Sequence, residues 1–245
     1  MMDSIKKAFM LSVAAVKVFT VIVVFNIIVN IINLMVIPAP VNAEMDLKKS
    51  FTILGIGLLF FLVAVFMQGG IIAYIRDLVK SGSANIASFI NNCSKYFLRM
   101  LGLVLITILI VLGWGVLFFG ALPLMVPALK TLFVILGLIS IIGIIILLIL
   151  PAYALVGSEL GAVAAIRKGV SVTVSNFLQI LGILIILILV AIVVMFLASF
   201  IIGILAIPVK QQAGGYIAAV VMAISSAVVT LLADIACMDF YLKKS

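Results

Sequence analysis

The sequence predicts an all-α integral membrane protein with six transmembrane helices, on three observations. Of its 245 residues, 68% are hydrophobic and 9% are charged, whereas a soluble domain has roughly 45–50% apolar and about 25% charged residues. The apolar residues form six runs of about 20 residues or more, long enough to cross a bilayer as an α-helix. These runs do not alternate in the way that membrane β-barrel strands do. A water-soluble domain, a disordered chain and a disulfide-stapled secreted domain are therefore excluded.

Each predicted span ends at a proline or at charged residues. The first span begins after three lysines and ends at Pro38, and the second ends at Arg76. The third and fourth spans end before Pro123 and at Pro151, and the fifth ends before Pro208. Proline ends a helix because it lacks the backbone N–H and clashes with the preceding turn. The predicted spans cover residues 18–37, 51–75, 98–121, 131–150, 177–207 and 216–238.

The distribution of basic residues predicts how the chain is oriented. With six spans, the two termini lie on the same side as the second and fourth connections. That side carries 11 of the 15 Lys and Arg residues, and the opposite side carries Lys48, Lys49, Lys130 and Lys210. Basic residues concentrate on the cytoplasmic side of membrane proteins. We therefore expect a multi-pass protein of the cytoplasmic membrane with both termini in the cytoplasm.

The first apolar run has a second interpretation. Val41-Asn42-Ala43, before Glu44, resembles a signal-peptidase site, and lysines precede the run as in a secretory signal. The run, however, covers about 20 residues and is longer than the usual apolar core of a signal peptide, about 7–15 residues. We expect an uncleaved first span, with cleavage after Ala43 as the alternative.

The two cytoplasmic connections are predicted to be amphipathic. In residues 83–97 the apolar positions recur every three or four residues, which places them on one helix face. Residues 158–176 mix apolar and basic positions in a similar way. Such a segment either lies in the headgroup plane or extends a membrane helix, and the sequence does not separate these two interpretations. The predicted contacts to anionic lipid headgroups are Arg76, Lys80, Lys95, Arg99, Arg167 and Lys168.

These two connections also resemble each other at a shift of 80 residues. Residues 96–102 align with residues 176–182, and upstream Ile86 aligns with Ile166. The second and third spans thereby pair with the fourth and fifth. Because both units begin on the same side, the predicted tandem repeat of a helix pair is parallel and not inverted.

One part of the chain resembles a known family. The segments Pro151-Ala-Tyr-Ala-Leu-Val, Gly161-Ala-Val-Ala-Ala-Ile-Arg-Lys-Gly-Val-Ser171 and Asn176-Phe-Leu are similar to the membrane domain attached to some glycerophosphoryl diester phosphodiesterases and to related polytopic proteins. The resemblance covers roughly residues 65–200. It implies a membrane module without catalysis of its own. The phosphodiesterase activity itself is not implied, because the chain has no histidine and few acidic residues.

Polar residues inside the predicted spans are the candidates for a functional path. Polar side chains are costly in lipid and usually face the bundle interior or a water-filled cavity. Spacings of three and four residues place three amides on one face of the first span and three polar groups on one face of the sixth. We expect these faces to contact each other, with Lys17 near the depth of Asp234. The candidate residues are Lys17, Asn26, Asn30, Asn33, Ser226, Thr230 and Asp234.

These polar residues have two open roles. Interhelical hydrogen bonds commonly serve as packing contacts worth about 0.6 kcal/mol each. The alternative is a path for a substrate or an ion.

The composition also bounds the chemistry. There is no histidine, and Cys93 and Cys237 are isolated, so we expect buried thiols, no metal, no cofactor and no nucleic-acid partner. Asp234 alone does not supply the paired groups that intramembrane catalysis needs. We therefore predict a non-catalytic module that binds membrane lipids or a membrane protein partner, including a second copy of the chain. The alternative is a small transporter or permease that uses the polar faces of the first and sixth spans.

Overall fold

The computed structural model describes residues 2–36, 47–120, 127–206, 209 and 211–245. The structure is 92% helical, with no strand in the described ranges, and six helical segments are long and apolar enough to cross a membrane. The predicted all-α polytopic class is thus confirmed. The elements are α1 (Met2–Ser12), α2 (Val16–Val36), α3 (Leu47–Ser81), η1 (Ile86–Ser88), α4 (Phe89–Gly120), α5 (Pro127–Leu147), α6 (Pro151–Gly157), α7 (Ala162–Ser175), α8 (Phe177–Ala206) and α9 (Gln211–Lys244).

The predicted spans fall on α2, α3, α4, α5, α8 and α9, and three of these helices are clearly longer than the predicted runs. Helix α9 extends beyond residues 216–238 at both ends, from Gln211 to Lys244. Helix α3 continues past Arg76 to Ser81, and α4 begins at Phe89 instead of residue 98. Helical backbone hydrogen bonds do not require apolar side chains, so hydropathy marks the apolar part of a helix and not its end. The predicted span ends at residues 37, 121 and 207, and the candidate cleavage site at Val41-Asn42-Ala43, lie outside the described residues.

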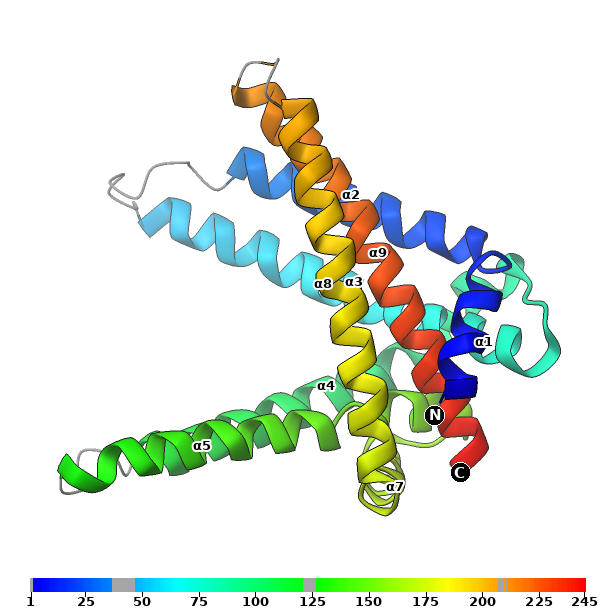
Figure 1. The fold of residues 1–245 in the computed structure, drawn as a ribbon, viewed down its shortest axis with the longest axis vertical. Coiled ribbons are helices and arrows are strands. Elements are labelled where there is room, and N and C mark those ends of the chain that lie inside the picture. Colours follow the sequence, from blue (N-terminus) through cyan, green and yellow to red (C-terminus); the bar gives the residue numbers. More distant parts are fainter. Residues whose placement is uncertain (1, 37–46, 121–126, 207–208, 210) are drawn as a thin grey trace.

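The long helices converge at one end of the molecule and diverge at the other. Figure 1 shows α4 and α5 running together in one direction, while α2 and α3 run in a second direction and α8 and α9 in a third. Helix α3 packs mainly on α4, and α9 packs on α8, α2 and α1. We call the shared end, where α1, α6 and α7 also lie, the base.

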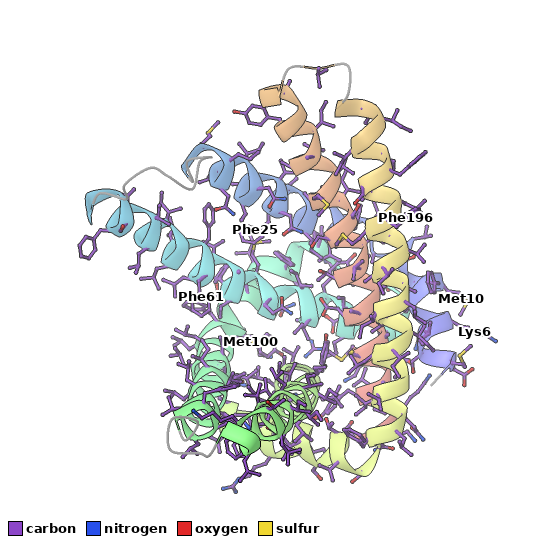
Figure 2. The ribbon with its side chains drawn as sticks, turned by 60° about the vertical axis from the view of Figure 1, so that its left-hand side comes forward. Lys6, Met10, Phe25, Phe61, Met100 and Phe196 are labelled. Carbon is purple, nitrogen blue, oxygen red and sulfur yellow. The ribbon has the colours of Figure 1, made fainter. Side chains whose placement is uncertain are left out.

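The hydrophobic core lies at the base. Ile75 of α3, Tyr96 of α4, Leu155 of α6 and Tyr241 of α9 are fully buried there in one cluster. The diverging halves instead expose large apolar side chains, as Phe196 on α8 does with 72% exposure (Figure 2). Apolar surface on this scale is expected to contact lipid and not water.

The two connecting segments at the base differ in structure. Residues 83–97 form η1 and then enter α4 without a break, so this connection is an extension of a membrane helix. Residues 158–176 instead include a separate helix, α7, which ends just before α8. Asn176 separates the two helices, because its side-chain amide donates to the Val172 carbonyl and its backbone leaves the helical conformation. Tyr96 stands at the equivalent position in the first unit, where the helix continues.

The two units of the predicted repeat each have a close helix contact, at neighbouring but not identical positions of the repeat. In the first unit Gly70 of α3 lies against Phe89 and Cys93 of α4. In the second unit Gly169 of α7 lies against Pro151 of α6, a pair that is related to Phe89 and residue 71 by the shift of 80 residues. Beyond these contacts the units differ, because α5 packs on α4 and α8 packs on α9. Whether the repeat arose by duplication stays a prediction.

The α3–α4 contact generates a testable prediction. A Cβ atom at Gly70 would overlap the Cys93 sulfur and lie 3.1 Å from the Phe89 carbonyl oxygen, so Gly70→Ala should destabilise the protein by about 1–3 kcal/mol. The measurement is the thermal melting temperature of the detergent-solubilised protein. Gly57→Ala in the same helix is the control, because no atom lies within 4 Å of its added Cβ. Equal melting temperatures for the two variants would contradict this close packing.

Candidate functional site

The loop between α6 and α7 carries a carboxylate that joins three elements at the base. Glu159 Oε1 accepts hydrogen bonds from Lys95 Nζ at 2.7 Å and from the Tyr96 hydroxyl at 3.2 Å, both on α4. Arg99 donates to the Glu159 carbonyl oxygen at 3.2 Å. Arg76 of α3 lies 3.5 Å from the same carboxylate. One acidic residue thus gathers three basic side chains from two helices.

The local backbone presents Glu159 to these partners. Glu159 has a φ of 54°, in the left-handed region that non-glycine residues seldom adopt. The hydrogen bond from Lys95 has the largest effect and that from Tyr96 the next largest, and together they hold the pKa of the Glu159 carboxyl below its ordinary value of 4.5. The charged carboxylate is therefore the form that the base stabilises.

Arg76 lies inside the base and not at its surface. The side chain is 15% exposed. Its guanidinium donates to Asp77 at 2.9 Å, to the Tyr96 hydroxyl at 3.0 Å and to the Val156 carbonyl at 3.2 Å. These contacts tie α3 to α4 and α6. We therefore assign Arg76 to the packing of the base and not to the headgroup contacts.

A second ion-pair cluster attaches α1 to the base. Asp239 of α9 is buried and lies 3.0 Å from Lys7 Nζ and 2.6 Å from Lys243 Nζ. Lys7 also donates to the Val79 carbonyl at 3.0 Å. The short α1 is thereby fixed to both α3 and α9. Sequence analysis missed this cluster, because Asp239 and Lys7 are far apart in the chain.

Asp234 is the buried carboxylate of α9, and its partner differs from the expected one. The side chain is 5% exposed, and Oδ1 accepts a hydrogen bond of 2.7 Å from the Tyr153 hydroxyl of α6. Its second oxygen is buried without a hydrogen-bond partner among the described residues. Lys17, which we expected near this depth, is exposed. The structure therefore pairs Asp234 with α6 instead of α2.

Part of the predicted polar faces of α2 and α9 lies together. Asn30 donates to the Ala219 carbonyl at 3.2 Å, which links the two helices directly. Asn26 lines a cavity of about 120 Å³ with Ser226 and Thr230. The structure adds Gln68 of α3 to this cavity, a residue that sequence analysis did not select although it is an amide inside a span. Asn33 is exposed, and Asp234 does not line the cavity.

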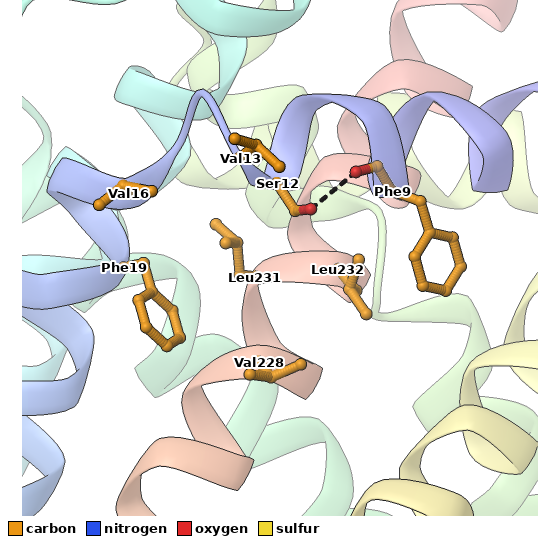
Figure 3. Close-up of a pocket in the computed structure, with 8 residues that line it drawn as sticks. All are labelled: Phe9, Ser12, Val13, Val16, Phe19, Val228, Leu231 and Leu232. Atoms are coloured by element: carbon orange, nitrogen blue, oxygen red, sulfur yellow. Dashed lines mark hydrogen bonds between the residues drawn. The ribbon is translucent and has the colours of Figure 1, made fainter.

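A larger apolar groove lies between α1, the start of α2 and α9. Figure 3 shows this groove, whose volume is about 290 Å³. Ser12 is its one polar residue, and the hydroxyl donates to the Phe9 carbonyl at 2.7 Å. The remaining lining residues are Phe9, Val13, Val16, Phe19, Val228, Leu231 and Leu232. The groove offers a ligand apolar contact but no free polar group.

Exposed cations occur at the base beside exposed apolar side chains. Lys95 and Arg99 flank Leu98, which is 76% exposed, on α4. On the outward face of α7, Arg167 lies one helical turn after the exposed Val163. The five exposed cations of the predicted headgroup set are Lys80, Lys95, Arg99, Arg167 and Lys168.

Neither a metal site nor a known relative assigns a function. Within the described ranges, no three Cys, Asp or Glu side chains gather closely enough to hold a metal ion, and both cysteines are buried. No protein-family model, curated protein or solved structure matches the chain. The resemblance to phosphodiesterase membrane domains therefore stays a prediction.

The Glu159 contacts predict a pH dependence of stability. The pKa of the Glu159 carboxyl is lower in the folded protein than its ordinary value of 4.5. The charged carboxylate therefore stabilises the fold fully when the pH is above 4.5, and this stabilisation is lost as the pH falls through the lower pKa of the folded protein. Glu159→Gln should therefore lower the melting temperature slightly at neutral pH, and the difference from the wild type should shrink on acidification. Asp3→Asn, at an exposed carboxylate, is the control and should leave the melting temperature unchanged. A difference for Glu159→Gln that is constant with pH would contradict this assignment.

Proposed function

We propose that the chain is a non-catalytic multi-pass membrane module that binds anionic lipid headgroups at its base. The observation that carries this proposal is the placement of exposed cations beside exposed apolar side chains where the spans end. Leu178, at the start of α8, is 81% exposed, and Arg167 and Lys168 lie on the helix that precedes it. Apolar side chains favour the acyl region, and the neighbouring cations reach the phosphates.

Helix α7 supports this proposal most directly. Its inner face, with Gly169 and Thr173, is buried against the base, while Val163, Arg167 and Val174 are exposed. A helix with apolar and basic residues on its outer face suits the boundary between headgroups and acyl chains. Each Lys or Arg near an anionic membrane surface contributes about 1 kcal/mol of attraction. In this arrangement the base faces the cytoplasm, where basic residues concentrate.

The absence of catalysis is part of the proposal. The buried carboxylates Asp234 and Asp239 have tyrosine and lysine partners, which suits packing of the helices. The resemblance to the membrane domain of some phosphodiesterases likewise implies a module without an activity of its own. The diverging apolar halves of the helices would then be covered by lipid.

One observation favours transport as the second candidate function. Asn26, Ser226 and Thr230, which the sequence selected as a polar path, line one cavity together with Gln68. Asp234 does not line this cavity, so the lining carries no ionisable group to couple to a solute. We therefore rank transport after lipid binding.

The headgroup proposal is tested by the response of the melting temperature to anionic lipid. In nanodiscs, anionic phospholipid should raise the melting temperature of the wild type over that in zwitterionic lipid. The double variant Arg167→Ala/Lys168→Ala should lose about 2 kcal/mol of this stabilisation, because it removes two cations. Lys130→Ala is the matched control, since Lys130 is exposed on α5 and predicted to face the opposite side. An equal response of all three proteins to anionic lipid would refute headgroup binding by α7.

A further inference from the structure

The cavity between α2, α3 and α9 brings together polar side chains from three helices. Helices α2 and α3 both pack on α9 and run outward from it on the same side (Figure 2). The cavity of about 120 Å³ lies among the three helices, with Phe25, Met67 and Ile71 among its apolar lining residues. It is thus formed by helix geometry and not by a loop.

Four polar side chains from the three helices line this cavity. They are two amides, Asn26 and Gln68, and two hydroxyls, Ser226 and Thr230, and all four are half-buried. None of them forms a side-chain hydrogen bond with another described residue, in contrast to Asn30, which donates to the Ala219 carbonyl. A polar group that leaves water without a hydrogen bond costs roughly 1–3 kcal/mol on mutational scales. The four side chains are half-buried around one cavity, so their polar groups are available to a small molecule that enters it.

We infer that this cavity is a binding site for a small uncharged molecule that both donates and accepts hydrogen bonds, with water as the smallest member of the class. The two amides and two hydroxyls supply donors and acceptors together. No charged side chain lines the cavity, so an ion would lose its hydration without a countercharge.

The size of the cavity limits the ligand. Since a water molecule occupies about 30 Å³ in the liquid, the volume admits a few waters or one solute of similar total size. Thr230 lies one helical turn before Asp234, but that carboxylate pairs with Tyr153 and is not part of the site. The site is therefore independent of the headgroup contacts at the base, and it goes beyond the proposed lipid binding.

The first test is the reactivity of a thiol introduced at position 226. Ser226→Cys is prepared in a Cys93→Ala/Cys237→Ala background and treated with methyl methanethiosulfonate in nanodiscs. Only the thiolate reacts, and it forms where water or polar groups solvate it. Ala227→Cys is the matched control, because Ala227 is fully buried at the next position of the same helix. We expect labelling at position 226 to be at least roughly tenfold faster than at position 227. Equal rates would overturn the inference.

The second test separates a binding site from direct packing contacts. Gln68→Met removes the amide at similar volume, and it should slow labelling at position 226 without lowering the melting temperature, because no protein hydrogen bond is lost. Asn30→Leu is the comparison, and it should lower the melting temperature because it removes the bond to Ala219. Protection of position 226 by glycerol identifies a solute site, and labelling without protection identifies water as the occupant. A lowered melting temperature for Gln68→Met with unchanged labelling would refute the site.

Discussion

In hydrocarbon, a polar group that has no hydrogen-bond partner within the protein destabilises the fold by the full free energy of losing its contact with water. The whole arrangement of the helices depends on this constraint. The polar contacts with long sequence separation concentrate at the base. Glu159 joins the α6–α7 loop to α4, Arg76 joins α3 to α6, and Asp239 holds α1. Apolar helices have no comparable preference for one another over lipid. The helices accordingly converge where most of their polar groups meet, and farther out single polar contacts join the helices in pairs, as Asn30 does with the Ala219 carbonyl and Trp114 with Ser140.

The fold class could be predicted from the sequence because long apolar runs are a local property. The helix ends could not, since α3 continues to Ser81 and α4 starts at Phe89 with polar residues in both extensions. The contact between α2 and α9 could be predicted from the sequence, because helical spacing places Asn26 and Asn30 on one face. The partners of Asp234, Asp239 and Glu159 could not be predicted from the sequence, because each pairing joins residues that only the tertiary structure brings together. Gln68 left a usable signal, an isolated amide within an apolar run.

The base and the cavity suggest different relations to the membrane. At the base, Lys95 and Arg99 of α4 contact Glu159 but stay exposed beside Leu98, and Arg167 of α7 is exposed on the helix that precedes Leu178. In the cavity, by contrast, the polar groups are uncharged and have no protein partners among the described residues. The proposed lipid binding thus follows from the exposed cations and apolar side chains of the base. The proposed solute binding follows from the polar side chains of the cavity that have no hydrogen-bond partner in the described protein. The two functions can be separated by substitutions on different helices.

The structure joins the helices at the base and separates them at the outer ends. The most direct test is to measure distances between pairs of spin labels by double electron–electron resonance in nanodiscs. In a background without Cys93 and Cys237, labels replace exposed residues near the outer ends of α4, α2 and α8, namely Phe119, Met35 and Leu205. Phe119 with Leu132 is the reference pair, because Phe118 and Phe133 stack between α4 and α5 at 4.7 Å. The structure predicts that Phe119–Met35 and Phe119–Leu205 are much farther apart than the reference pair. Distances as short as the reference in both pairs would show a closed bundle and contradict this account.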